Sequence, residues 1–368
     1  MADTLRDQLV HFDWKKSEPV HALLCLPGVA LPLLVGIHYG YPGTAALMAG
    51  GAQCVGFGSY QQPLFRKSGA MVAAAVGIAI SAMVGALCRD STAALLCAAA
   101  VWAFLYGLSN SLSTASAWVG QQCCVFLIIS SAAPSTPGTT HDLVYSALLR
   151  GAGVLAGAAL QALLMLSFRY HLPQAQTMYS KPDFDPTHFQ RSFLREQLDW
   201  RGGAMQFSFR LVVTALVSVS LYRTQTWASA YWIGMTAMLV PKPEFTQTVA
   251  RGVMRASGTL LGALVCTLIV IAARPRGEVL AALALVFLFF TYLLVNVNYG
   301  SFSVALTGYI CFILAVAHNP PREVLAHRVA ATVIGASLAF GIHLLFLTGR
   351  RLLGIATPRL RSLEERLN

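Results

Sequence analysis

The chain is 368 residues long, 56% hydrophobic and only 11% charged, with a mean hydropathy of +0.61. A soluble domain needs a charged and polar shell, so this composition excludes one and indicates an integral membrane protein. The net charge of +11 indicates orientation rather than nucleic-acid binding, because most Lys and Arg residues lie in the loops and termini that the predicted spans place on one side. By the positive-inside rule, both termini are predicted to be cytoplasmic.

Apolar stretches recur along the whole chain and are separated by short Pro, Gly or charged breaks. A membrane span needs roughly 17 to 25 residues, and the stretches are apolar on every side, unlike the alternating strands of a barrel. Two of them, residues 44–59 and 227–241, are short, so ten spans with re-entrant segments there are the alternative. We predict twelve helical spans, at residues 21–38, 44–59, 69–88, 91–108, 117–133, 143–168, 206–222, 227–241, 256–273, 278–295, 300–317 and 324–348.

One long polar interruption divides these spans into two groups of six. Within it, Phe189, Phe193 and Trp200 alternate with charged residues at near-helical spacing, which predicts an amphipathic helix on the inner leaflet. We therefore predict a cytoplasmic segment at 1–20, a first six-span repeat at 21–168, a cytoplasmic linker at 169–205, a second six-span repeat at 206–348 and a cytoplasmic tail at 349–368.

The two groups share sparse sequence matches that indicate a tandem duplication. Because six is even, the two repeats would have the same orientation in the membrane. The matches involve residues that are uncommon inside spans: "RKSG" (66–69) with "RASG" (255–258), Tyr106 and Asn110 with Tyr292 and Asn296, Arg150 and Gly157 with Arg328 and Gly335, and His21 with Arg210.

An arginine followed by small residues three and seven places later occurs four times. Each copy opens an apolar stretch, so a cation lies near the end of a helix whose small face lets a second helix approach closely. The topology puts the first and third copies near the cytoplasmic face and the other two near the outer face. The copies are Arg66/Gly69/Ala73, Arg150/Gly153/Gly157, Arg255/Gly258/Gly262 and Arg328/Ala331/Gly335.

All Asp and Glu residues lie outside the span centres, so a transported cation has no obvious counter-charge. Arginine stays charged and binds carboxylates in a two-pronged fashion, which favours an anionic substrate. The alternative is that these arginines only anchor helices at the interface, with the small residues as packing faces. The candidate substrate-binding residues are Arg255, Arg66, Arg150, Arg328 and Arg210.

No enzyme, nucleotide or metal motif is present in the sequence. A Gly-x-Ser-x-Gly elbow, a His-Glu-x-x-His pair and a phosphate-binding loop are all missing, and the cysteines lack zinc-ligand spacing. We therefore predict a protein that is not an enzyme and has no cofactor or metal.

The string "YWIGMTAMLVPKPEFTQTVARGVMRASGTLLGALV" (231–265) resembles the signature of the fusaric acid resistance and aromatic acid exporter family. "YPGTAALM" (41–48) and "RKSGAMVA" (66–73) look like degenerate copies in the first half. The resemblance implies a bacterial inner-membrane efflux component for aromatic carboxylic acids. The residues that carry the signature are Tyr231, Trp232, Pro241, Pro243, Arg251, Arg255, Gly258, Thr259 and Gly262.

We therefore predict export of small organic, especially aromatic, carboxylates along an arginine-lined path in the inner membrane. One alternative is a passive organic-anion channel, and another is a non-transporting membrane-assembly or envelope-biogenesis protein. The expected partners are the organic anion and membrane lipid, with a second copy or efflux partner proteins as further options.

Overall fold

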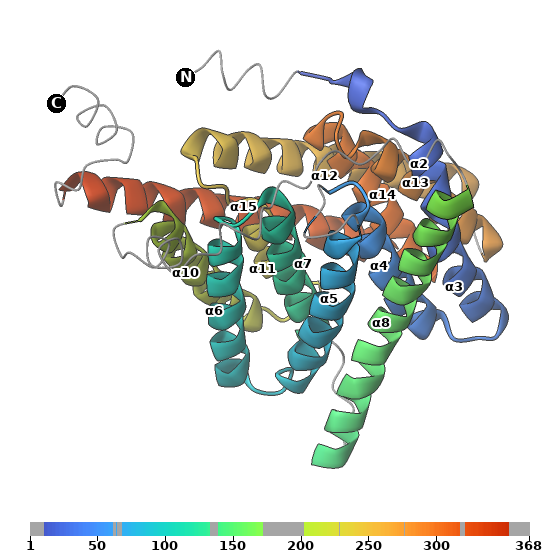
Figure 1. Cartoon of the computed structure of the whole chain (residues 1–368), viewed down its shortest axis with the longest axis horizontal. Helices are drawn as coiled ribbons and strands as arrows, with labels where there is room; N and C mark the ends of the chain where they lie inside the picture. Colours follow the sequence, from blue (N-terminus) through green and yellow to red (C-terminus); the bar gives the residue numbers. More distant parts are fainter. Residues whose placement is uncertain are drawn as a thin grey trace.

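The computed structural model describes residues 11–61, 64, 68–132, 139–171, 202–227, 229–275, 277–316 and 321–352. This part of the chain is all α-helical after the short 3-10 turn η1 (Trp14–Lys16), as predicted (Figure 1). The predicted linker helix, most of the tail and Arg66 lie outside the described residues.

The helices follow the chain in two groups. The first group is α2 (Pro19–Leu24), α3 (Leu26–His38), α4 (Pro42–Gly58), α5 (Gly69–Leu87), α6 (Thr92–Ser109), α7 (Thr114–Ser131) and α8 (Thr140–His171). The second group is α10 (Gly203–Arg223), α11 (Trp232–Leu239), α12 (Phe245–Ala273), α13 (Glu278–Leu294), α14 (Tyr299–Val316) and α15 (Pro321–Leu352).

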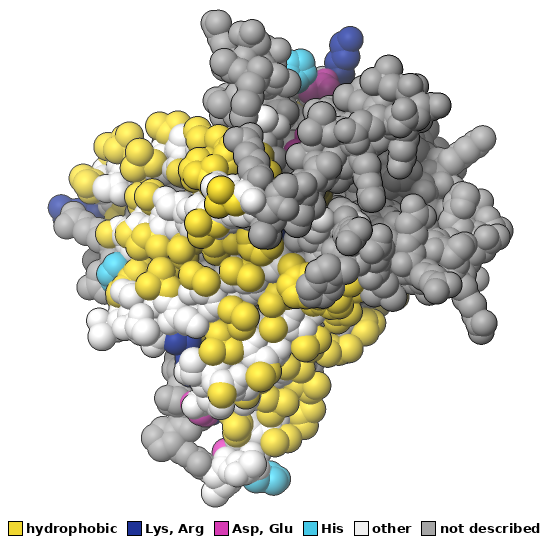
Figure 2. Space-filling model, turned by 90° about the vertical axis from the view of Figure 1, so that its left-hand side faces the viewer, with side chains coloured by type: hydrophobic (Ala, Val, Ile, Leu, Met, Phe, Trp, Pro, Cys, Tyr) yellow, Lys and Arg dark blue, Asp and Glu magenta, His cyan; other side chains and the backbone are white. Residues whose placement is uncertain are grey.

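Each predicted span overlaps a helix, and eight of the described helices are long and apolar enough to cross a membrane. Large apolar side chains that a soluble protein would bury are exposed, including Leu163, Leu268 and Leu345. Hydrophobic atoms also cover much of the described surface in Figure 2. A multi-pass membrane protein is therefore confirmed, whereas a count of twelve spans stays a prediction.

Two helix boundaries differ from the predicted spans. The prolines at 241 and 243 end α11 after eight residues, because proline has no amide hydrogen to continue a helix. Helix α12 begins at Phe245 rather than near residue 256, because the polar segment between them contains no proline to interrupt a helix. Arg251 and Arg255 consequently lie inside a long helix rather than at its mouth.

The same helix pairings recur in the two groups. In the first, α4 packs against α3 and α8, and α5 packs against α7 and α8; in the second, α11 packs against α10 and α15, and α12 against α14 and α15. In Figure 1, α12 and α15 run across the view while α5, α6 and α8 run down it. The two groups contact each other through helix pairs that include α6 with α10 and α3 with α13.

Small residues of the fourfold pattern lie where helices cross. A Cβ atom on Gly157 would overlap the carbonyl oxygen of Met48 on α4. On Gly258 it would lie 2.6 Å from the carbonyl oxygen of Gly300 on α14, and on Gly335 it would lie 2.6 Å from that of Ile233 on α11. The close approach of these backbones supports the packing interpretation of the small residues.

The pattern contains a matched pair of glycines that tests this interpretation. Gly157→Ala should lower the apparent melting temperature in detergent and destabilise the fold by about 1 to 3 kcal/mol, because α8 must move away from α4. Gly153→Ala should have little effect, because the nearest atom to its Cβ would be Leu47 Cβ at 3.9 Å. Equal melting temperatures for the two variants would contradict the assignment of Gly157 to a helix crossing.

Candidate functional site

A cavity of about 490 Å³ lies between the two groups of helices. The first group contributes residues of α4, α6 and α7, such as Gln53 and Gln121, and the second contributes residues of α11, α12 and α14, such as Trp232 and Tyr309. The hydrophobic cores also contain residues of both groups. The cavity therefore depends on both halves of the chain.

The cavity is aromatic and positively charged. Three basic residues line it, Lys242, Arg251 and Arg255, and no Asp or Glu is among its described lining residues. Aromatic rings from both groups face the same space: Phe57, Tyr106, Trp118, Tyr231, Trp232 and Tyr299. Cations combined with ring faces suit a ligand that has a negative group and a flat apolar body.

A second cavity of about 310 Å³ adjoins the first. The two share Lys242, Arg251, Val295, Asn296 and Tyr299, so these side chains stand at their junction. The second cavity lies beside the amino-terminal segment, where Asn298 Nδ2 donates a hydrogen bond to the His11 carbonyl at 3.0 Å. We refer to the first cavity as the inner cavity and to the second as the vestibule.

Helix α12 places Arg251 and Arg255 one turn apart. Arg251 Nε donates to the Leu239 carbonyl at 3.0 Å, which caps α11, and its guanidinium carbon lies 4.1 Å from the ring centroid of Tyr299. Arg255 is only 1% exposed, and its Nε has no hydrogen-bond partner in the described structure. The ion pairs among the described residues join Lys16 to Asp13 and Arg89 to Asp90, so neither Arg251 nor Arg255 is neutralised by a described carboxylate.

Lys242 lies between the two prolines of the α11–α12 loop. The nearby Arg251 charge and burial lower the pKa of Lys242 to about 7. The lysine is therefore charged below about pH 7 and neutral above it. This titration makes the positive potential at the junction of the cavities dependent on pH.

Anion binding should weaken about three- to tenfold as the pH rises from about 6 to about 8, because one positive charge is lost near the site. Benzoate remains ionised over this range and is a suitable ligand for calorimetric titration in detergent. Lys242→Arg should abolish the pH step, since arginine stays charged. Persistence of the step in that variant would contradict its assignment to Lys242.

Arg210 is buried on α10, and its guanidinium holds the Lys242 loop. Its Nη1 donates to His343 Nε2 at 2.7 Å, while Nη2 donates to the carbonyl oxygens of Lys242 and Pro243. Because a guanidinium only donates, His343 Nε2 must accept, which places the ring proton on Nδ1, 3.1 Å from Thr248 Oγ1. Arg210 is not among the cavity-lining residues, and a direct role in anion binding stays a prediction.

Arg328 is 1% exposed, and none of its three guanidinium nitrogens has a hydrogen-bond partner in the described structure. Its guanidinium carbon lies 4.1 Å from the centroid of the Trp232 ring, which itself lines the inner cavity. Arg328 also lies close enough to Arg255 for electrostatic repulsion. The two second-half arginines of the fourfold pattern are thus brought together beside the cavity.

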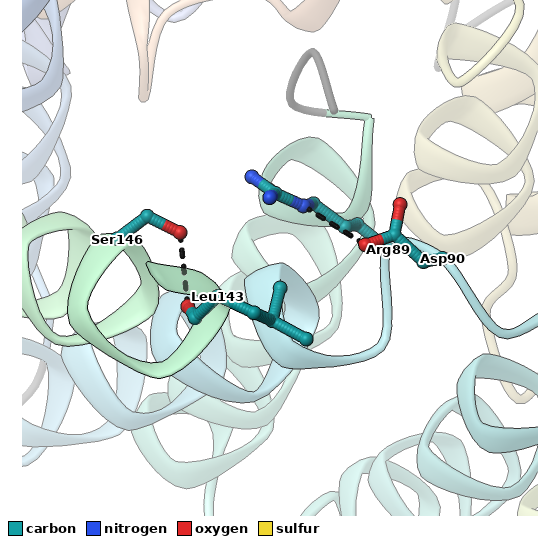
Figure 3. Close-up of polar contacts among 4 residues, drawn as sticks. All are labelled: Arg89, Asp90, Leu143 and Ser146. Atoms are coloured by element: carbon teal, nitrogen blue, oxygen red, sulfur yellow. Dashed lines mark hydrogen bonds and ion pairs between the residues drawn. The ribbon is translucent and has the colours of Figure 1, made fainter. Parts of the chain in front are cut away.

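Arg150 lies on α8, within electrostatic range of Arg89 and Tyr231. Arg89 Nε donates a hydrogen bond to Asp90 Oδ2 at 3.3 Å (Figure 3). The same view shows the first turns of α8, where Ser146 Oγ donates to the Leu143 carbonyl at 2.9 Å. Arg150 is not among the lining residues of either cavity. Tyr231 links it to the inner cavity, since Tyr231 lines that cavity and interacts with both Arg150 and Arg328.

Comparison with known proteins identifies the part of the chain that holds the charged site. Residues 211–342 match the family described as fusaric acid resistance protein-like. This part of the chain is similar to that family. The predicted resemblance is therefore confirmed, and the matched region contains Arg251, Arg255, Tyr299 and Arg328.

Three curated proteins are similar to this chain over about 40% of its length. They are the uncharacterized protein YhfK of Escherichia coli K12 (28% identical over 148 residues), the uncharacterized protein ORF2 of Neisseria gonorrhoeae (27% over 152) and the uncharacterized protein slr1298 of Synechocystis (25% over 144). The aligned region spans only 21%, 35% and 19% of these relatives, respectively. No solved structure matches the chain.

The structure also places in the site two residues that were not among the predicted site residues, Lys242 in the matched region and Gln121 outside it. Lys242 lies in the signature string between Pro241 and Pro243. Its position at the junction of the two cavities depends on how the α11–α12 loop folds, which the sequence does not show. Gln121, from the first half, donates to Tyr106 Oη at 3.1 Å and to the carbonyls of Met238 and Leu239, both at 3.2 Å. The sequence shows Gln121 as a polar residue in an apolar helix, but it does not show which groups Gln121 contacts.

Proposed function

We propose that this protein exports small organic anions, aromatic carboxylates in particular, through the inner cavity. The observation that carries the proposal is the lining of that cavity: Arg251, Arg255 and Lys242 stand among aromatic rings, with no carboxylate among the described lining residues. A carboxylate of the ligand would provide the negative charge that the protein does not. The rings would cover its apolar body.

The proposed path extends beyond the cavity through a succession of cations. From the vestibule it passes Lys242 and Arg251, then Arg255 and Arg328, and finally Arg150 with Arg89 near the start of α8. Several moderate sites are better suited to transport than one tight site, because an ion must both enter and leave. Export, rather than uptake, is what the resemblance to the fusaric acid resistance and aromatic acid exporter family implies.

We also propose that the two helix groups are repeats. Besides the recurrent helix pairings, His21 Nε2 and Ser59 Oγ are hydrogen-bonded at 2.7 Å in the first group. At the same sequence offset, Arg210 and Thr248 share His343 as a partner in the second group. The second group thus has a cation, Arg210, at the position that corresponds to His21 in the first group.

Flux measurements with purified protein in liposomes test the proposed function. Labelled benzoate should cross the membrane in protein-containing liposomes, whereas neutral benzamide should show no protein-dependent flux. Unitary currents that only follow the electrochemical gradient would instead support the passive channel. Absence of benzoate flux, together with a stably co-purifying protein, would contradict transport and support the membrane-assembly alternative.

A further inference from the structure

Tyr299 lies where the vestibule meets the inner cavity, at the first residue of α14. Its neighbour Gly300 lies against α12. A Cβ atom on Gly258 of α12 would lie 2.6 Å from the Gly300 carbonyl oxygen, and a Cβ atom on Gly300 would lie 3.8 Å from Met254 Cγ. This close crossing places the Tyr299 side chain beside the turn of α12 that carries Arg251 and Arg255.

Tyr299 presents both its ring and its hydroxyl to the arginines. The ring faces the Arg251 guanidinium at 4.1 Å, and the hydroxyl lies within electrostatic range of both Arg251 and Arg255. A phenol oxygen has lone pairs to offer guanidinium donors, as a carboxylate has, but it carries no charge when protonated. Tyr299 therefore combines an oxygen acceptor with a flat ring face, the two features that an aromatic carboxylate would present.

We propose that Tyr299 is an internal surrogate for the transported anion, occupying the Arg251–Arg255 site until a carboxylate displaces it. This inference rests on the proposed function and assigns a specificity-determining residue to it. Displacement would move the ring away from the junction and connect the vestibule with the inner cavity. A ligand without an oxyanion could not compete for the two guanidinium groups, so neutral aromatics would be excluded.

A competing hydroxyl lowers the apparent affinity for the ligand, because its contacts must be broken before the carboxylate binds. Tyr299→Phe removes the hydroxyl and keeps the ring that faces Arg251. The variant should therefore bind benzoate about three- to tenfold more tightly than the wild type, as expected for removing one polar group that competes for the two guanidinium groups. In transport, the change should appear as a lower KM for benzoate.

Tyr222→Phe is the matched control. Tyr222 lies on α10, outside the lining of both cavities, and its hydroxyl and Ser131 Oγ are hydrogen-bonded at 2.7 Å. Removing that hydroxyl should leave the benzoate affinity unchanged. The pair of variants thus separates competition at the arginines from a general effect of removing a tyrosine hydroxyl.

The test is a calorimetric titration of the full-length wild type and both variants with benzoate in detergent. Tighter binding by Tyr299→Phe alone supports the surrogate role, including the case in which only this variant binds measurably. Weaker binding would make Tyr299 a ligand of the substrate, and unchanged binding would make it a bystander; either result overturns the inference while the proposed function stands. Absence of binding and of flux in all three proteins overturns both.

Discussion

Replacing Arg255 with methionine is expected to lower benzoate flux in liposomes by about tenfold to a thousandfold, the range for removing one member of a buried charge contact. Arg255 is almost fully buried, and it lines the inner cavity one turn from Arg251. Methionine approximates the length of the side chain but provides neither charge nor donors. Arg255→Lys should restore part of the flux, because it returns the charge without the two-pronged geometry.

Arg223→Met is a suitable control for the Arg255 variants. Arg223 ends α10, and its Nε donates to Thr92 Oγ1 at 3.1 Å, away from the residues that line either cavity. The control removes one cation from the protein but none from the proposed path, so its flux should match the wild type. Equal flux in wild type and Arg255→Met would remove Arg255 from the account, whatever the control shows.

Replacing Arg328 with methionine is expected to change stability and transport in opposite directions. The guanidinium is buried without a hydrogen-bond partner in the described structure, and the Trp232 ring faces it. Burial of a charge without hydrogen-bond partners is costly, so an apolar side chain of similar size should stabilise the fold by about 1 to 4 kcal/mol. If the charge is retained for conducting anions, flux should fall in the same variant.

Thermal unfolding in detergent and benzoate flux in liposomes, measured on the same preparation, check the two signs. A higher melting temperature with lower flux fits a residue kept for function at a cost in stability. A strongly lowered melting temperature would show that the Arg328–Trp232 contact is structural. Unchanged flux would take Arg328 off the proposed path.

Hydropathy predicted the positions of most helices because the membrane-crossing segments are apolar over their whole length. It missed the start of α12, since residues 245–255 are polar enough to resemble a loop but contain no proline. The shortness of the 227–241 segment was visible in the sequence. The two prolines account for it, because they end α11 after eight residues.

The candidate arginines illustrate what the sequence could not separate. Arg255 and Arg210 both appear as cations inside apolar segments, but one lines the inner cavity and the other bonds to loop carbonyls and His343. Arg210 is held by the carbonyl oxygens of the Pro-Lys-Pro loop, and the contact between this loop and α10 forms only in the folded protein. Lys242 was hidden for the same reason, since its place at the junction is set by the fold of the loop.

A structure of the full-length protein with 4-bromobenzoate bound would test the central claim most directly, because the bromine marks the ligand's orientation. We expect the carboxylate between Arg251 and Arg255, the ring among the aromatic side chains of the inner cavity, and Tyr299 displaced from its contact with Arg251. A ligand found only on the lipid-facing surface, or an inner cavity that stays unoccupied at saturating ligand, would contradict it.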